Sequence, residues 1–336
     1  MAADALSDVL KAVRLTGATF FDIVARAPWA AESAPRELLL PKILPGASNL
    51  IAYHVITEGS CYASMDGVES MALEAGDVIV FTRGDLHVLS SSPGMRADPE
   101  ADDSLAALVG RRLPIRLDIG NEGPVSAKFV CGFLACDAQP FNPLLDNLPP
   151  IIRVSGRPNR DEPGSDADWL AQFVRLAIAE SGDKRAGGES VLARLSELMF
   201  IEVVRRHLAS LAPAQAGWLA GLRDPFVGKA LTLLHARPAH DWTIEELGRG
   251  VGLSRSVLAE RFADLVGVPP MLYLAKWRMQ IAAGMHSAGN ATMAAIAAEI
   301  GYGSEAAFSR AFKKLVGQPP SAWRRRGGDG PSGASN

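Results

Sequence analysis

The spacing of apolar residues changes near residue 166, and this change divides the sequence into two kinds of structure. Between residues 38 and 136, short apolar segments such as 49–57 (NLIAYHVIT) alternate with turn residues, and Asp66-Gly67 is typical of a hairpin turn. Short strands separated by glycine-containing turns predict a small antiparallel sandwich or barrel. Residues 91–124 combine charge, proline and glycine, which favours a loop around residues 91–103.

From residue 166 onward the apolar residues repeat at helical spacing. The pattern predicts a helix that starts near residue 166 and a second helix over 189–209. The apolar stripe of the second helix must be buried against the barrel, the companion helix or a second subunit. Residues 210–218 contain proline and glycine and are the best candidate for a connection, and the segments from 224 to 326 read as helices of ordinary length.

These patterns predict an α+β protein of two domains, and a chain of 336 residues is long enough for both. Residues 1–212 are expected to form a small antiparallel β-barrel followed by helices. A linker over residues 213–218 then leads to an all-α domain over 219–326. Residues 327–336 are expected to be a disordered tail.

Charged residues are distributed unevenly between the two domains. The chain carries 34 Lys and Arg against 37 Asp and Glu, a net charge of −3. Residues 1–221 carry −8, residues 222–326 carry +6, and Asp329 supplies the remaining −1. This asymmetry suggests that only the second domain approaches a polyanion such as nucleic acid.

Several other classes of protein do not fit this composition. The chain has no run of 18 apolar residues, so a membrane span is not expected, and its first 15 residues lack the apolar core of a secretory signal. Three cysteines, Cys61, Cys131 and Cys136, are too few for a disulfide framework, and we expect them to be reduced and buried. These features favour a cytoplasmic protein.

The all-α domain contains an internal repeat. Residues 254–270 (SRSVLAERFADLVGVPP) and 304–320 (SEAAFSRAFKKLVGQPP) match at an offset of 50, with seven identities in 17 positions. Each copy predicts a helix, a glycine-containing turn and a second helix that follows a serine, which is the arrangement of a helix-turn-helix unit. Residues 269–286 predict a helix about 25 Å long between the units, which suits one chain that reads successive DNA turns about 34 Å apart.

Four motifs of the second copy are informative together: residues 296–302 (IAAEIGY), 304–313 (SEAAFSRAFK), 317–320 (GQPP) and the pair Trp323-Arg324. With these motifs, residues 222–326 resemble the DNA-binding domain of the AraC family of transcription regulators, in which Tyr-Arg usually takes the place of Trp-Arg. The first copy matches more loosely. The resemblance implies a sequence-specific regulator that binds double-stranded DNA.

The resemblance also implies which side chains lie on the DNA. Residues that cap the reading helices or face the major groove would be Ser254, Arg255, Ser256 and Arg261 in the first copy, and Ser304, Glu305, Ala306, Ser309 and Arg310 in the second. Residues that meet phosphates would be Lys276, Arg278, Lys313 and Arg324 with its two neighbours. Glu305 keeps two interpretations, because it could accept a hydrogen bond from cytosine N4 or interact with the positive end of its helix.

Residues 76–87 (GDVIVFTRGDLH) resemble the second motif of cupins, with Thr82 in place of proline. Together with residues 53–59 (YHVITEG) and 130–133 (VCGF), they make the first domain similar to the cupin-type sensory domain found in front of some AraC-type DNA-binding domains. Catalytic cupins supply two histidines and a glutamate from the first motif and a third histidine from the second.

Of that ligand set only His54, Glu58 and His87 are present, and three uses of these residues stay open. With Cys61 and Cys131 they could bind a small effector or a divalent metal such as zinc, since imidazole and thiolate are zinc ligands. The thiols could instead sense a redox change. Alternatively, the histidines are hydrogen-bonded barrel residues and the cysteines fill small spaces in the core. No cofactor follows with certainty.

The function that these observations favour is a transcription regulator, with activation as the working expectation. Its barrel would sense a small effector or a chemical state, the helices over 166–209 would form a homodimer, and RNA polymerase is a candidate partner. The alternative is a metal-dependent cupin enzyme fused to a DNA-binding domain, and the incomplete ligand set argues against it. A third hypothesis is an architectural DNA-binding protein with no effector. We therefore expect no enzymatic activity.

Overall fold

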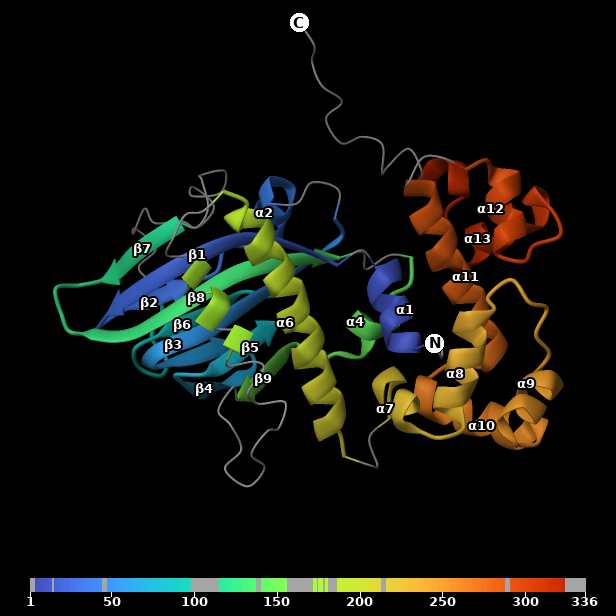
Figure 1. Ribbon diagram of the computed structural model, residues 1–336, viewed down its shortest axis with the longest axis horizontal. Coiled ribbons are helices and arrows are strands. Elements are labelled where there is room, and N and C mark those ends of the chain that lie inside the picture. Colours follow the sequence, from blue (N-terminus) through green and yellow to red (C-terminus); the bar gives the residue numbers. More distant parts are fainter. Residues whose placement is uncertain are drawn as a thin grey trace, which may run out of the picture. The chain divides into compact units, whose positions relative to one another are not determined.

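The computed structural model describes residues 4–13, 15–43, 47–97, 115–136, 140–155, 172–173, 175–177, 179–180, 186–212, 216–287 and 291–323. The chain forms two compact units (Figure 1). The strand unit comprises Leu15–Cys136 and Leu148–Ser210, and the helical unit comprises Met1–Arg14, Asp137–Asn147 and Leu211–Asn336. None of the described helices combines the length and the apolar character that crossing a membrane requires.

The strand unit is built on one curled sheet. Its elements are β1 (Thr16–Arg26), β2 (Ala30–Glu32), α2 (Arg36–Ile43), β3 (Asn49–Met65), β4 (Val68–Glu74), β5 (Asp77–Phe81), β6 (His87–Ser90), β7 (Ile115–Gly120), β8 (Val125–Cys136), β9 (Ile151–Ser155) and α6 (Gly188–Ser210). The main strand order is β2-β6-β3-β8-β1-β7, while β4 and β5 pair with β3, and β9 pairs with β5.

Strand β3 curls the sheet because it changes partners along its length. Its first half pairs with β8 and β5, and its second half pairs with β4 and β6, all antiparallel. The predicted barrel-like fold is confirmed. The structure differs from the antiparallel expectation in one pair, because β7 runs parallel to β1, from Phe21↔Ile115 to Arg26↔Gly120. That pairing accounts for a strand that the sequence did not predict, within the stretch 91–124 that is rich in charge, proline and glycine, since sheet contacts override propensity.

The side chains of β3 alternate between the interior of the curled sheet and helix α6. Tyr53 points to α6, where its hydroxyl lies 2.5 Å from Ser196 Oγ, and both side chains are buried. The backbone N–H of Gly17 in β1 donates to Glu197 Oε1 at 3.1 Å. Figure 1 shows α6 lying along the sheet, so the predicted helix over 189–209 is confirmed and covers one face of the sheet.

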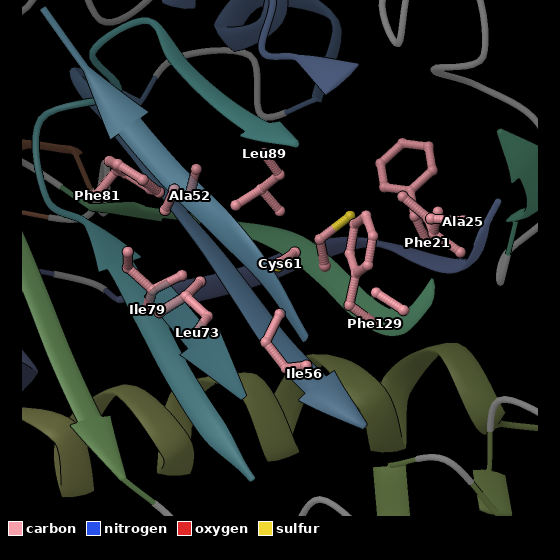
Figure 2. Packing of buried hydrophobic residues seen from close by; sticks show 14 of the residues in the cluster. Phe21, Ala25, Ala52, Ile56, Cys61, Leu73, Ile79, Phe81, Leu89 and Phe129 are labelled. Atoms are coloured by element: carbon pink, nitrogen blue, oxygen red, sulfur yellow. The ribbon is translucent and has the colours of Figure 1, made fainter. Parts of the chain in front are cut away.

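Alternate positions on the other face of the sheet form the interior core. Figure 2 shows Ile56 and Cys61 of β3 packed with Leu73 and Phe129, with Leu89 close by. All three cysteines are free and buried, as the sequence predicts. A strand whose alternate side chains are apolar fixes its own register, because a shift of one residue would exchange the interior face for the α6 face.

The helical unit contains the two predicted helix-turn-helix units. Its elements are α1 (Ala5–Ala12), α4 (Pro143–Asn147), α7 (Trp218–Arg223), α8 (Val227–Ala236), α9 (Ile244–Val251), α10 (Arg255–Val266), α11 (Pro270–Ser287), α12 (Met293–Glu299) and α13 (Glu305–Val316). The first unit is α9–α10 and the second is α12–α13, and α11 lies between them in the chain. Apolar residues of α11, α12 and α13 form one core with Phe308 and Phe312 at its centre.

Helices α1 and α4 belong to this helical unit, which differs from the single first domain expected over residues 1–212. Gln280 of α11, only 1% exposed, ties both segments to the helices. Its Oε1 accepts from the backbone N–H of Phe141 at 3.0 Å, and its Nε2 donates to the carbonyl oxygen of Ala12 at 3.3 Å. The oxygen and the nitrogen of this buried amide are both hydrogen-bonded. Displacing either segment would leave a buried polar atom unpaired, which is costly, so the amide favours this arrangement strongly.

The end of the expected linker over 213–218 is also ordered structure. Trp218 is fully buried at the start of α7, and the backbone N–H of Gly217 donates to the carbonyl oxygen of Leu265 at 2.7 Å. Residues 213–215 lie outside the described residues, as do Arg324 and the expected tail over 327–336.

Two turn glycines offer a matched test of the helix-turn-helix packing. Gly252 (φ +85°) and Gly301 (φ +81°) are both left-handed, but a Cβ on Gly252 would meet nothing within 4 Å, whereas a Cβ on Gly301 would lie 2.3 Å from the carbonyl oxygen of Ala239. We expect Gly252→Ala to lower the free energy of unfolding by about 1–2 kcal/mol through backbone strain alone. Gly301→Ala should cost about 1–3 kcal/mol more, because of the added overlap. Urea unfolding of the two variants measures both; equal losses would contradict the packing of Gly301 against Ala239.

Candidate functional site

The two reading helices begin in the same way. Ser254 precedes α10 and its Oγ accepts from the backbone N–H of Val257 at 3.4 Å, while Ser304 precedes α13 and its Oγ accepts from Ala307 at 3.2 Å. Serine at this position satisfies an N–H group that the helix itself leaves unpaired. Both predicted caps are present, so these hydroxyls act first on their own helices.

Each reading helix buries one face and exposes the other. Leu258 and Phe262 of α10 are buried, as are Phe308 and Phe312 of α13, so the aromatic residues are core. The exposed or half-buried face carries most of the residues that the sequence assigned to DNA: Arg255, Ser256, Glu305, Ala306, Ser309, Arg310 and Lys313. Glu305 stands in the first turn of α13, where its charge interacts favourably with the helix dipole.

Arg255 has a partner within its own unit. Its guanidinium Nη1 lies 2.9 Å from Glu245 Oε1 of α9, and both side chains are more than half exposed. An exposed pair of this kind contributes little to stability, so Arg255 can exchange this carboxylate for another hydrogen-bond acceptor at small cost.

Arg261, which the resemblance assigns to the groove, has a partner within the helical unit. Its guanidinium donates to Asp224 Oδ2 through Nε at 2.9 Å and also through Nη2, and it lies over the ring of Phe226, 5.4 Å from its centre. Asp224 Oδ1 accepts from the backbone N–H groups of Phe226 and Val227 at the start of α8. These hydrogen bonds lower the pKa of Asp224 although its partial burial opposes them.

Arg278, which the resemblance assigns to a phosphate, also has partners within the helical unit. Its guanidinium is about half-buried and donates to the carbonyl oxygens of Pro238 and His240 at 2.7 and 2.9 Å. Lys276 lies over the ring of Phe141, 5.5 Å from its centre. Both side chains of α11 therefore hold neighbouring segments of the helical unit.

The second candidate site is a cavity inside the curled sheet. It has a volume of about 30 Å³, room for one or two water molecules. Its lining is mainly apolar and combines residues of β1, β2, β3, β6 and β8 with the segment after β2: Ile23, Ala31, Glu32, Ser33, His54, His87, Leu89, Phe129, Cys131, Gly132 and Phe133. The structure thus brings His54, His87 and Cys131 to one space.

The protons of the two histidines are determined by their surroundings. His87 Nδ1 lies 2.8 Å from the carbonyl oxygen of Asp85, which can only accept, so Nδ1 carries the proton and Nε2 does not. His54 Nε2 lies 2.8 Å from His87 Nε2 and therefore donates to it. His54 Nδ1 is left as a buried acceptor with no partner among the described residues. A buried acceptor without a partner points to a small molecule or a water in this cavity.

Burial sets the charge state of this site. Desolvation lowers the pKa of His87 to about 4 although the Asp85 carbonyl opposes it, and desolvation with the neighbouring His87 holds the pKa of His54 well below its usual range. Burial also raises the pKa of the Cys131 thiol. At neutral pH the site therefore presents two neutral imidazoles and an un-ionised thiol.

The metal-ligand set considered from the sequence is not assembled. Glu58 lies at the surface, where its Oε2 forms an ion pair with Lys128 Nζ at 2.8 Å. Cys61 is buried in the core, and burial, with the charge of Asp77, raises the pKa of its thiol to about 12. Within the described residues, no group of three or more histidine, cysteine, aspartate or glutamate side chains is arranged to hold a metal.

The sequence did not indicate Asp224, Asp85 or Ser33. Asp224 stands before a predicted helix, where aspartate is a common capping residue, and this was the only available signal. Asp85 acts through its backbone carbonyl, which no side-chain motif reveals. Ser33 belongs to no motif, and its Oγ accepts from the backbone N–H of His87 at 3.0 Å.

Known families and relatives match both parts of the chain. A family described as Cupin matches residues 4–209, and a family described as Helix-turn-helix domain matches residues 247–326. A protein of Streptomyces lividans named as an AraC-like transcription regulator is 34% identical over 96% of this chain and 98% of its own length. The chain belongs to the AraC-like transcription regulators. The predicted family, the cupin-type N-terminal domain and the function in DNA-binding regulation are confirmed.

More distant proteins are also similar to this AraC-like regulator. The HTH-type transcriptional regulator AlkR of Acinetobacter baylyi is 25% identical over 96% of this chain and 99% of its own. The crystal structure of ToxT from Vibrio cholerae O395 matches 94% of this chain and 98% of that chain, with 10% identity and a TM-score of 0.34.

The buried histidines make the stability of the regulator depend on pH. An unfolded histidine binds a proton near pH 6.5, but folded His87 does so only near pH 4, so the unfolded chain binds more protons between these values and stability falls as the pH falls. The wild type is expected to lose free energy of unfolding between pH 7 and pH 5. We expect His87→Gln, which keeps an acceptor but does not titrate, to reduce that loss by about 2 kcal/mol. Urea unfolding at each pH measures the loss. Ser90→Ala in the same strand should lower stability equally at all pH values; a His87→Gln curve parallel to the wild type would refute the buried neutral state.

Proposed function

We propose that this regulator reads double-stranded DNA with the exposed faces of α10 and α13 and binds a small effector in the cavity beside His54. The observation that carries the first part is the repeated unit, in which capped helices expose polar and basic residues while their aromatic residues are buried. Helix α11, at 18 residues, spans about 27 Å, which suits two successive major-groove segments about 34 Å apart.

Charge supports the same assignment. Residues 222–326 carry a net +6, against −8 for residues 1–221. In the second unit, Arg310, Lys313 and Lys314 are exposed and form no ion pair among the described residues. A cationic side chain that neutralises a phosphate releases a counterion from DNA. Because these three side chains would not have to break an ion pair first, this unit would supply much of the salt-dependent affinity.

The cavity supports effector sensing over catalysis. It is lined mainly by apolar side chains, its lining residue His54 has a buried Nδ1 without a partner among the described residues, and its histidines are neutral at pH 7. A neutral molecule that donates one hydrogen bond would be recognised there. Strand β8 contributes Phe129, Cys131 and Phe133 to the cavity and ends at Cys136, shortly before the segment that Gln280 holds in the helical unit. Effector binding would act through this strand by shifting the population of DNA-binding states.

Homodimerisation through α6 is part of the proposal. Val191 and Leu198 are nearly half exposed and stand seven residues apart, which places them on one helix face. A partner copy would cover this face. The cytoplasm is the compartment that fits three free, buried cysteines and a DNA partner. Transcription activation through RNA polymerase completes the proposal.

Arg310 tests the DNA assignment. Sites selected from random duplexes by the full chain supply the specific probe, and we expect Arg310→Met to cost about 1–3 kcal/mol on that probe if the guanidinium reads a base, with little loss on unrelated DNA. Lys229→Met removes one exposed charge from α8 and serves as the control. Fluorescence anisotropy at several salt concentrations measures both. A wild-type chain that binds DNA without steep salt dependence would contradict the proposal.

His54 tests the effector assignment. We expect His54→Phe, which fills similar space and removes the free acceptor, to keep the affinity for DNA but to lose stabilisation by small neutral molecules that donate hydrogen bonds. A ligand at 100 times its Kd stabilises the wild type by about 2.7 kcal/mol, which a thermal-shift screen detects. His240→Phe at the surface of the helical unit is the control. A hit that stabilises wild type and His54→Phe equally would place effector binding elsewhere.

A further inference from the structure

The internal repeat allows the two reading helices to be compared position by position. At the offset of 50, the caps Ser254 and Ser304 coincide, as do the buried pair Leu258 and Phe262 with Phe308 and Phe312. Because caps and buried faces coincide, the exposed faces coincide as well. The residue of α10 that corresponds to Arg310 is then Glu260, and Arg261 corresponds to Ala311.

The charges of the two reading faces are inverted. The first turn of α10 carries Arg255 where α13 carries Glu305, and five residues later α10 carries Glu260 where α13 carries Arg310. All four side chains are exposed. The two units therefore share one backbone arrangement but present opposite charges at equivalent positions.

Helix stability does not explain Glu260. It lies in the middle of α10, away from the favourable N-terminal end, and the exposed Asp264 follows at i+4, where like charges destabilise a helix. Glu260 forms no ion pair among the described residues. A carboxylate on a surface that approaches phosphates is unfavourable unless it gains a hydrogen-bond donor. Exocyclic amino groups of bases supply such donors in the major groove, and glutamate pairs with cytosine N4.

Arg261 is committed to another task. Its guanidinium forms two hydrogen bonds with Asp224, which also caps α8, and Asp224 is only 10% exposed. The pair joins the middle of α10 to the corner between α7 and α8. Arg261 thus fixes the direction of the reading helix and does not need to reach a base.

We infer that Glu260 is a base-reading residue that selects cytosine at the first unit, at the position where Arg310 reads the second, and that Arg261 is a positioning residue. This inference rests on the proposed reading of DNA by α10 and α13. Its consequence is that the two half-sites of one chain differ in sequence although the two units are repeats, since an arginine at the Arg310 position favours guanine.

Selection from a pool of random duplexes by the full-length chain tests the inference. We expect Glu260→Gln to reduce the preference for cytosine at one position of the selected site about tenfold, with adenine rising, because glutamine pairs with adenine N6 and N7. Asp264→Asn removes the same charge from the same helix and should leave every base preference unchanged. We expect Arg261→Met to weaken binding to all sequences while base preferences and the slope of log K against log salt stay the same.

Four results would overturn the inference. Glu260→Gln could select the same site as the wild type, or Asp264→Asn could change the same base as Glu260→Gln. Arg261→Met could alter the preference at a single base, or lower the salt slope by about 0.9, which marks a phosphate contact. A wild-type chain that enriches no sequence would instead refute the proposed function, and this inference with it, so the two failures are distinguishable.

Discussion

The backbone hydrogen bonding of β3 is the constraint on which the strand unit depends. This strand pairs with β8 and β5 and then with β4 and β6, so the sheet must curl where the partners change. The alternation of its side chains then places Tyr53 against α6 and His54 inside the cavity. Packing of the outer helix and chemistry of the inner cavity are consequences of a single register.

Both candidate sites follow the rule that a buried or structurally committed polar group needs a defined partner. The Asp85 carbonyl sets the proton of His87, which sets that of His54, and His54 Nδ1 is left as an acceptor without a partner among the described residues. In the helical unit, Asp224 accepts two hydrogen bonds from Arg261, so this guanidinium already has a partner within the unit. Residues whose hydrogen bonds are satisfied inside the protein position other groups, whereas residues with an unsatisfied polar atom can bind a ligand or a base.

Local signals made the helical unit predictable from the sequence. The caps Ser254 and Ser304, the glycine turns and the helical spacing of apolar residues all act within a few positions, so both helix-turn-helix units were predicted correctly. The strand unit was predicted as a class, but the parallel partner of β1 was not, since that pairing joins residues about a hundred positions apart. The pairs Arg261–Asp224 and His54–His87 are likewise nonlocal, and periodicity carries no information about them.

The place of α1 and α4 has a consequence for biosynthesis. Ala5–Ala12 and Pro143–Asn147 leave the ribosome long before α11, whose Gln280 completes their hydrogen bonding. During translation the strand unit can close on itself, whereas α1 must wait for α8 and α11, which lie in the last third of the chain, before it packs against them. The barrel is thus inserted, in two pieces, into the chain of the helical unit. Exchanging the strand unit between such regulators would require junctions at both ends of each of its two segments. A chimaera with a single junction would separate α1 from the helices against which it packs.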